Sequence, residues 1–471
     1  MVHNLGTHEE AEMNASTYSA RRSALRRAVP DGTILILGND EAPRNYVDNV
    51  YPFRQDSHLL YYAGVSQARL AVLIEPGGRT VLYGTPEHRD DVIWHGPHAT
   101  LEDHAAAAGI SDFDDFGNLA DRLGEFAAGG TKIHYLPPYR AQRRFALSRL
   151  LGTDPREVAG QTSVELVRAV AAQRSIKEEA EIAEIEDALA VTALMYRATL
   201  RAAGPGLTEA QVAAAHQMEA IAADRQQAFN PIVTVSGEVL HNTTYDGTLA
   251  NGDLLLVDSG AESSRFYASD ITRTMPVSGH FTGQQRDVYE VVLAANMSAI
   301  AAASPERTNR ELHLLAARTV AAGLKDIGLM QGDVDEAVEA GAHALFFVHG
   351  LGHMLGIDVH DMEDLGDVVG YAQGEERSTQ FGLAYLRLAR KLEPGFVITI
   401  EPGIYFIPAL IDRWQADGLH KEFICYDRLV AYRDFGGIRI EDDVLITAEG
   451  SRVLGPPIPK TVADVEAAME S

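Results

Sequence analysis

Residues 349–361 read HGLGHMLGIDVHD, which places three histidines and three glycines within one short segment. His349 and His353 are four residues apart and would share one face of a helix. Each of the glycines, however, would cost a helix roughly 1 kcal/mol relative to alanine. We therefore expect a turn or a short strand whose backbone passes close to another part of the protein. With Asp358 and Asp361, the histidines form a candidate ligand site, and a glycine-rich loop with structurally satisfied histidines is the alternative.

The composition limits the classes of function that the chain can have. Its 471 residues are enough for two or three domains with a sizeable core. The formal net charge is −27, from 40 basic and 67 acidic side chains. This balance argues against nucleic acid or an anionic membrane surface as a partner, because phosphate binding depends on clustered Lys and Arg. No apolar run approaches the roughly 20 residues that span a bilayer.

The single cysteine and the N-terminus bear on the compartment. One cysteine, Cys425, excludes an intramolecular disulfide and fits a reducing environment. The first sixteen residues, MVHNLGTHEEAEMNAS, lack the basic and then apolar pattern of a signal peptide. We therefore expect a cytoplasmic protein.

The first third of the chain mixes strand and helix patterns. Residues 31–40 and 68–84 are β-branched or apolar runs, and the second range predicts a hairpin around Pro76-Gly77-Gly78. Alanine-rich, amphipathic segments follow. We expect a mixed α/β domain over residues 1–170.

The second part begins with helices. Ser175 and Glu178 have the spacing of a capping box and predict the start of a long helix that ends near residue 203. Thr208 and Gln211 have the same spacing and predict a second helix. From residue 230 onward, short hydrophobic strands that end in acidic residues alternate with helices. We expect a second domain over residues 171–471.

Acidic residues lie at or next to the ends of four of these strands. Asp258 closes LLLVD, Asp270 opens DITRTMP, Glu401 closes VITIE and Glu441 ends GGIRIE. If they gather around His353, they cannot all ionise unaided, because like charges at close range raise each other's pKa. Two divalent metal ions bridged by shared carboxylates would resolve this conflict and would activate a water for hydrolysis. Hard oxygen ligands with one histidine favour Mn²⁺, with Co²⁺ or Zn²⁺ as alternatives.

The same residues have a second interpretation. Sequence separation does not show that the five side chains converge, and each of them could be a solvated or capping residue at the end of a strand. The residues alone therefore leave a two-metal hydrolase as a hypothesis.

Four carboxylates and one histidine follow in the order Asp258, Asp270, His353, Glu401 and Glu441. This order, together with the motifs HGLGHMLGIDVHD, EPGIYFI and FGGIRIED, resembles the metallopeptidases of the pita-bread fold. Within them it is similar to the branch of prolidase and aminopeptidase P, and YPFRQDSHLLYYAGV (51–65) resembles the N-terminal domain of that branch. The resemblance covers nearly the whole chain. It implies an α+β fold in which a pita-bread catalytic domain is preceded by a smaller mixed α/β domain. It also implies a homodimer that hydrolyses the bond before proline in di- or oligopeptides.

The resemblance assigns the metal ligands residue by residue. Asp258 would bind one metal ion through both oxygens. Asp270 and Glu441 would bridge the two ions. His353 and Glu401 would complete the coordination of the second.

The resemblance also implies catalytic and substrate-binding residues. Glu401 would transfer the proton of a water or hydroxide that attacks the carbonyl before proline. His360 would hydrogen-bond the substrate carbonyl or the developing oxyanion, a suitable task for a preorganised donor, and His349 would contact the substrate. His241 would line the proline side of the site. Arg439 would orient groups around the ligands.

One spacing departs from the family pattern. Eleven residues separate Asp258 from Asp270, one more than we expect for the family. A turn around residues 262–265 could absorb the extra residue. Inside a strand, it would move alternate side chains to the opposite face.

Two features favour a dipeptidase within this branch. Arg387, fourteen residues before Glu401, matches the position where prolidases carry an arginine, and a bidentate guanidinium suits the free carboxylate of a dipeptide. The forty-residue step from Glu401 to Glu441 also resembles the prolidase insertion. We therefore expect an Xaa-Pro dipeptidase (prolidase). An Xaa-Pro aminopeptidase (aminopeptidase P) is the alternative, and a non-catalytic pita-bread binding module is less favoured.

Overall fold

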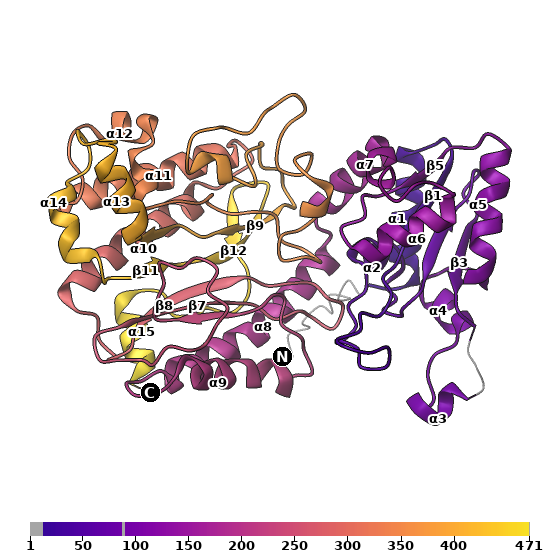
Figure 1. Cartoon of the computed structure of the whole chain (residues 1–471), viewed down its shortest axis with the longest axis horizontal. Helices are drawn as coiled ribbons and strands as arrows, with labels where there is room; N and C mark the ends of the chain where they lie inside the picture. Colours follow the sequence, from indigo (N-terminus) through magenta and orange to yellow (C-terminus); the bar gives the residue numbers. More distant parts are fainter. Residues whose placement is uncertain (1–12, 87–89, 471) are drawn as a thin grey trace, which may run out of the picture. The chain divides into compact units, whose positions relative to one another are not determined.

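A computed structural model describes residues 13–86 and 90–470 (Figure 1). The first twelve residues, which belong to the stretch expected to lack a signal peptide, lie outside this range. The chain forms two compact units. The first contains the chain up to Arg174 together with Met362–Val368, and the second contains Ser175–Asp361 and the chain from Val369 onward. The domain limits 1–170 and 171–471 stay a proposal.

The first unit is built on a five-stranded sheet with the order β4-β3-β2-β1-β5. The strands are β1 (Thr33–Leu37), β2 (Ala71–Ile74), β3 (Thr80–Gly84), β4 (Asp112–Asp115) and β5 (Ile133–Tyr135). The predicted hairpin is confirmed, since β2 pairs with β3 across a turn in which Gly77 and Gly78 have φ values of +88° and +91°. Glycine is favoured there because it lacks the Cβ that makes positive φ costly.

Helices accompany this sheet. They are α1 (Ala15–Ala28), α2 (Ser57–Ala63), α3 (Asp91–His95), α4 (Leu101–Ala107), α5 (Leu119–Ala128), α6 (Ala141–Leu151) and α7 (Val164–Ser175). Leu35, Leu73 and Val81 of the sheet form one buried cluster with Leu119 and Leu123 of α5. This apolar cluster is a core of the first unit.

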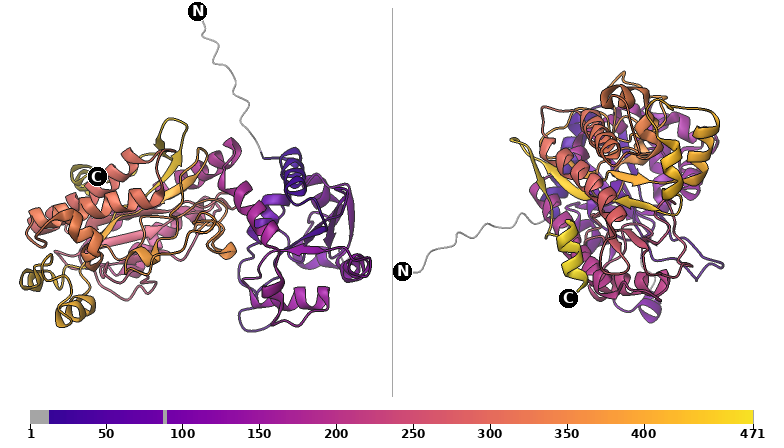
Figure 2. Two further views of the ribbon diagram at one scale, coloured as in Figure 1. Left: turned by 90° about the horizontal axis from the view of Figure 1, so that it is seen from above. Right: turned by 90° about the vertical axis from the view of Figure 1, so that its left-hand side faces the viewer.

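The second unit contains the long helices. They are α8 (Glu179–Ala202), α9 (Glu209–Ala222), α10 (Gly283–Ala302), α11 (Asn309–Asp326), α12 (Val334–Ala340), α13 (Pro408–Ala416), α14 (Tyr426–Leu429) and α15 (Val462–Met469). The helices pack in pairs, α8 with α9 and α10 with α11 (Figures 1 and 2). Threonine capping boxes begin α9, α10 and α11, which confirms the predicted box at Thr208 and Gln211. None of the helices in the described part of the chain is long and apolar enough to cross a bilayer.

The predicted helix start at Ser175 is wrong. Ser175 ends α7, and α8 begins after Glu178, whose capping box is made with Glu181. Tertiary contacts override the local pattern between the two helices. The backbone N–H of Lys177 donates to the carbonyl of Gly395, and its ammonium contacts the buried Asp361 carboxylate.

Strands of the second unit form antiparallel sheets. They are β6 (Ile232–Thr234), β7 (Leu254–Ser259) and β8 (Ile271–Pro276), then β9 (Val397–Ile400), β10 (Gly403–Tyr405), β11 (Gly437–Arg439), β12 (Asp442–Ile446) and β13 (Ser451–Val453). The strand orders are β6-β7-β8, β13-β12-β9 and β10-β11. The candidate carboxylates lie on these strands or next to their ends.

The pairing of β7 with β8 accommodates the long spacing between Asp258 and Asp270. Asp258 faces Thr272, and the same register continues to the bridge between Glu262 and Ala268. The pairing register of β7 with β8 therefore does not shift between these residues. Any additional residue lies in the turn over residues 263–267.

A second pairing brings two glutamates together. β9 pairs with β12 and β10 pairs with β11 in one register, in which Ile400 faces Asp442 and Gly403 faces Arg439. The same register places Glu401 opposite Glu441, at the interruption between the two ladders.

The histidine-rich segment runs beside β9. The N–H of Thr399 donates to the carbonyl of His353, and the N–H of Glu401 donates to the carbonyl of Leu351. Gly352 allows this approach, because a Cβ at that position would lie 1.9 Å from the carbonyl oxygen of Thr399. The segment is not helical and passes close to other backbone, as expected, and its one β-bridge pairs Met354 with Ile398 of β9.

Candidate metal centre and substrate cavity

One cavity of about 820 Å³ in the second unit collects the predicted site residues. Its wall contains all ten of them: His241, Asp258, Asp270, His349, His353, His360, Arg387, Glu401, Arg439 and Glu441. Apolar side chains, among them Phe229, Leu240 and Leu410, form other parts of the wall. The cavity therefore combines a cluster of carboxylates and histidines with an apolar lining.

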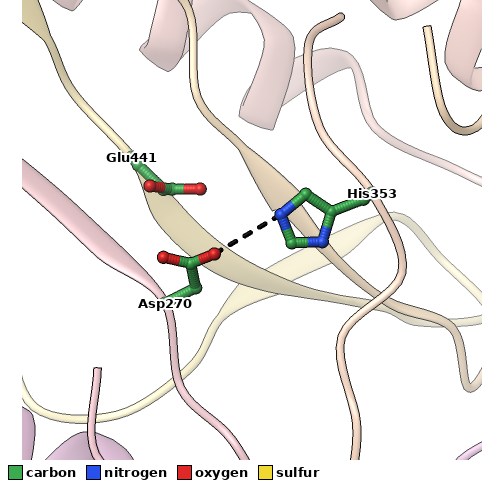
Figure 3. A group of neighbouring side chains, drawn as sticks. All are labelled: Asp270, His353 and Glu441. Atoms are coloured by element: carbon green, nitrogen blue, oxygen red, sulfur yellow. Dashed lines mark ion pairs between the residues drawn. The ribbon is translucent and has the colours of Figure 1, made fainter. Parts of the chain in front are cut away.

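Three buried side chains form the centre of the cluster (Figure 3). Asp270 precedes β8, Glu441 precedes β12, and His353 comes from the histidine-rich segment. One ligand atom from each lies within 4.8 Å of the ligand atoms of the other two. His353 Nε2 is 3.4 Å from Asp270 Oδ2 and 3.8 Å from Glu401 Oε1. Asp270, His353 and Glu441 can therefore hold one metal ion between them. Glu401 lies at the edge of this group.

The hydrogen bond of His353 fixes which ring nitrogen faces this centre. Its Nδ1 is 3.0 Å from the carbonyl oxygen of Met354, which can only accept, so Nδ1 carries the proton. The lone pair of Nε2 then points toward Asp270, as Figure 3 shows. A neutral imidazole whose other nitrogen donates to a carbonyl is a common metal ligand.

The carboxylate oxygens test whether a cation fits. Asp258 Oδ1, Asp270 Oδ1 and Glu441 Oε1 are buried and lack a hydrogen-bond partner among the described residues. Buried polar atoms are almost always paired. Unpaired oxygens on three carboxylates that line one cavity therefore suit a bound cation. The donor set of hard oxygens and one imidazole fits a divalent metal ion.

The protonation equilibria of the carboxylates give the same indication. Burial, followed by the charges of Glu441 and Asp258, raises the pKa of Asp270 well above its ordinary value. Burial and the charges of Glu401 and Asp258 raise the pKa of Glu441 in the same way. A cation would relieve both effects, because it stabilises the ionised carboxylates.

Hydrogen bonds hold the other oxygens of two carboxylates. The hydroxyl of Thr272 donates to Glu441 Oε2 at 2.7 Å, and Arg439 donates to Asp258 Oδ2 at 2.6 Å. Arg439 Nε also donates to the Thr272 hydroxyl at 3.1 Å. This network fixes one oxygen of Asp258 and one of Glu441 and leaves Asp258 Oδ1 and Glu441 Oε1 unpaired among the described residues.

His349 belongs to the same network. Its Nδ1 donates to the carbonyl of Gly350 at 2.8 Å, so its Nε2 accepts from the hydroxyl of Tyr405, also at 2.8 Å. Tyr405 in turn accepts from Arg439 at 2.8 Å. Burial and the nearby Arg439 lower the pKa of His349 to about 3, which keeps the ring neutral. Sequence reasoning missed Tyr405, although it stands within the EPGIYF motif.

The remaining predicted residues lie on the cavity wall. The ring of His360 is 4.0 Å from that of His353, between ring centres. The side chains of His241 and Arg387 are exposed. The structure thus brings these ten residues to one cavity, which Asp358 and Asp361 do not line, and the individual roles are proposals.

A buried ion pair supports the loop that carries His360. Lys177 Nζ lies 2.9 Å from Asp361 Oδ2, and each side chain is only 1% exposed. Asp361 Oδ1 accepts from the N–H of Asp358 at 3.3 Å. The pair therefore anchors the end of the histidine-rich segment.

Two sequence families match the chain. Residues 183–448 match metallopeptidase family M24, and residues 18–134 match the N-terminal domain of aminopeptidase P. These matches confirm the predicted fold class, a pita-bread catalytic domain preceded by a smaller N-terminal domain.

Relatives with named activities cover nearly the whole chain. An Xaa-Pro dipeptidase from Homo sapiens is 32% identical and aligns with 94% of this chain and 90% of its own length. An Xaa-Pro aminopeptidase from Escherichia coli K12 is 29% identical, with 98% of both chains aligned. Among solved structures, aminopeptidase PepP from Pseudomonas aeruginosa has a TM-score of 0.80 at 29% identity, covering 98% of both chains. A zinc-substituted aminopeptidase P from E. coli, solved with product, has a TM-score of 0.81 at 27% identity and covers 98% of this chain and 99% of its own.

Proposed function

Because the chain belongs to metallopeptidase family M24, we propose that it hydrolyses the peptide bond before proline in Xaa-Pro dipeptides. Family membership confirms the expectation of a metallopeptidase. The named relatives do not decide between a dipeptidase and an aminopeptidase, since both kinds have similar identity to this chain. The choice of dipeptidase is therefore ours, and it rests on Arg387 in the cavity wall.

We propose that two divalent ions bind Asp258, Asp270, His353, Glu401 and Glu441. Mn²⁺ is expected, and Co²⁺ or Zn²⁺ are the alternatives. When bound, such ions supply Lewis-acid polarisation of a carbonyl and a lowered pKa for a water molecule. The unpaired oxygens of Asp258, Asp270 and Glu441 support this assignment.

Glu401 is suited to move the proton in the reaction. Its side chain is 19% exposed, against 6% for Asp270, and it lines the cavity. The carboxylate would accept a proton from the attacking water and deliver it to the proline nitrogen as the peptide bond breaks. Its neighbour in the register, Glu441, is held by Thr272, which leaves the proton transfer to Glu401.

Two histidines can act on the peptide itself. We propose that His360 donates a hydrogen bond to the carbonyl oxygen that becomes the oxyanion, where a preorganised donor lowers the barrier. His241 lines the same cavity as the apolar side chains of Phe229 and Leu240, and we propose that it lies on the side that receives the proline ring. His349 also lines the cavity, and we propose that it contacts the substrate and, through Tyr405 and Arg439, orients the ligand Asp258.

Arg387 carries the choice of substrate. A dipeptide has a free carboxylate on its proline, and a guanidinium can bind that group with two charge-assisted hydrogen bonds. Residues 402–440 add Ile407 and Leu410 to the same cavity wall. We propose that this wall recognises the end of a dipeptide.

The size of the cavity favours the alternative substrate. A volume of about 820 Å³ lies high in the range of roughly 300–1,000 Å³ found for ligand pockets, so the cavity could admit more than a dipeptide. An aminopeptidase that removes the residue before proline from longer chains is therefore the second candidate.

The substitution Arg387→Ala tests the choice between these two candidates. The KM for Ala-Pro should rise about 10- to 100-fold, because a charge-assisted hydrogen bond contributes roughly 1.5–3 kcal/mol. The KM for Ala-Pro-Ala should change less than threefold, since its proline carries no free carboxylate. Steady-state kinetics on both peptides provides the measurement.

A matched variant controls for the loss of an arginine. Arg428 is an exposed residue of α14, in the segment between Glu401 and Glu441, and does not line the cavity, so Arg428→Ala should leave both KM values unchanged. Equal increases for the dipeptide and the tripeptide in Arg387→Ala would contradict the dipeptidase assignment.

The homodimer and the cytoplasmic location remain parts of this proposal. The homodimer is implied by the resemblance to the family, and the location is suggested by the single cysteine. Sedimentation equilibrium tests the first, and a sedimenting species of one chain's mass would refute it. Cell fractionation tests the second, and recovery outside the cytoplasmic fraction would refute it.

A further inference from the structure

A third arginine of the cavity is without a role in the mechanism described above. The wall contains Arg387, Arg413 and Arg439. Arg439 is buried and donates to Asp258, Thr272 and Tyr405, so its charge serves the metal site. The side chain of Arg413 is exposed, and its guanidinium makes no hydrogen bond or ion pair within residues 13–86 and 90–470. Its guanidinium can therefore bind a ligand without breaking a described polar contact.

The position of Arg413 on α13 directs it to the cavity. Ala409, Leu410 and Arg413 all line the cavity, and residues three or four apart share one face of a helix. The neighbouring Asp412 does not neutralise this face, because its Oδ2 is paired with Arg433 at 2.9 Å. The cavity-facing side of α13 thus presents a cation next to apolar side chains.

The segment that carries Arg387 packs against the same helix. The ring of Phe381 is 5.7 Å from that of Trp414 in α13 and 5.8 Å from that of Tyr385, between ring centres. Phe381 and Tyr385 also line the cavity. Arg387 and Arg413 therefore come from two segments that pack against each other, and both line the cavity.

We propose that Arg413 is a specificity-determining residue that binds the terminal carboxylate of the substrate together with Arg387. This inference rests on the proposed function, because it assigns a second cation to the same end of an Xaa-Pro dipeptide. Two guanidinium groups attract one carboxylate more strongly than a neutral amide, and they penalise a peptide that continues beyond proline. The chemical class that Arg413 recognises is thus a free carboxylate next to an apolar ring.

A comparison of carboxylate and amide ligands tests the inference. In the wild type, kcat/KM for Ala-Pro should exceed that for Ala-Pro amide. Arg413→Ala should lower kcat/KM for Ala-Pro about tenfold, through KM, and should change the value for the amide less than threefold. Arg413→Lys should restore part of the loss, since it keeps the charge. Arg428→Ala again serves as the control.

Binding of L-proline and L-prolinamide, measured by calorimetry on the metal-loaded protein, gives a second readout that does not depend on turnover. Arg413→Ala should weaken L-proline about tenfold and leave L-prolinamide unchanged. If the wild type cleaves neither peptide but this binding difference is found, the proposed function fails and the role of Arg413 stands. If Arg413→Ala affects acid and amide equally, or affects neither, the inference is overturned while hydrolysis of Ala-Pro still supports the proposed function. A wild type that neither cleaves these peptides nor binds L-proline overturns both.

Discussion

Single glycines explain why the histidine-rich segment has so flexible a sequence. Gly352 lies where a Cβ would be 1.9 Å from the carbonyl oxygen of Thr399, and at Gly356 a Cβ would be 2.5 Å from the carboxylate of Asp361. The sequence predicted a close approach of backbone, because glycine is the residue that permits one. It could not predict that the neighbour is β9, which lies more than forty residues further along the chain.

The role of Tyr405, in contrast, could not be predicted from the sequence. Its hydroxyl connects His349 with Arg439, which come from the histidine-rich segment and from β11. Neither the spacing nor the chemistry of a tyrosine in a strand predicts such a link. The contact depends on the tertiary arrangement of segments that are separated by 34 and 56 residues.

Two buried histidines outside the cavity make the stability of the second unit sensitive to pH. His313 on α11 and His343 are fully buried, and none of their four ring nitrogens has a hydrogen-bond partner among the described residues. Burial lowers the pKa of His313 to about 3 and that of His343 to about 4. In the unfolded chain, both histidines begin to bind protons at about pH 6.5. In the folded protein, both rings are still neutral at that pH.

The sign of the pH dependence follows from these lowered pKa values. The unfolded chain binds the protons at about pH 6.5, so the stabilisation is complete above that pH and is lost as the pH falls toward 4. For His343, the loss between neutral pH and pH 5 is about 2 kcal/mol. His343→Leu should reduce the drop in unfolding free energy over this range by that amount, as measured by urea denaturation. His280→Leu, at a residue that is 63% exposed, is the control. An unchanged drop in His343→Leu would contradict the account.

At the scale of elements, strand register creates the site. Glu401 and Glu441 are opposite each other because β9–β12 and β10–β11 share one register. Asp258 and Thr272 are opposite each other in β7–β8. Hydrophobic runs that end in carboxylates could be recognised in the sequence, so each carboxylate could be predicted as a candidate metal ligand by itself. Their convergence could not be derived from those runs, because pairing between distant strands leaves little local trace.

The short connection between α7 and α8 makes a testable contribution to stability. Lys177 and Asp361 form an ion pair in which each side chain is 1% exposed. Lys177→Met should destabilise the second unit by about 3–5 kcal/mol, because it leaves a buried carboxylate without its counter-charge. Urea denaturation followed by circular dichroism provides the measurement.

A double variant separates the ion pair from the packing of the lysine side chain. Lys177→Met combined with Asp361→Asn removes both charges and should be more stable than Lys177→Met alone. If the double variant is less stable than the single variant, the buried charge is not the cause of the loss.

At the scale of the whole molecule, the sequence predicted the class of protein. Composition argued against nucleic acid and anionic membrane surfaces as partners, and the ordered motifs indicated the fold that the family matches confirm. No local pattern marks Met362–Val368 as part of the first unit. Within that unit, Asp364 Oδ2 pairs with His58 Nε2 at 3.1 Å, across 306 residues of sequence. The return of this short segment to the first unit is a tertiary contact that no local sequence pattern predicts.

The central claim is a metal-dependent hydrolysis of the bond before proline with a preference for dipeptides. The direct test measures the hydrolysis of Ala-Pro beside Ala-Pro-Ala on metal-stripped protein, with and without added Mn²⁺. Glu401→Gln serves as a folded control that should lose turnover at least about 100-fold, because it cannot transfer the proton. We predict cleavage of Ala-Pro that requires added metal and exceeds cleavage of Ala-Pro-Ala. Preference for the tripeptide would contradict the dipeptidase assignment, and undiminished cleavage of either peptide by the metal-free protein would contradict the metal centre.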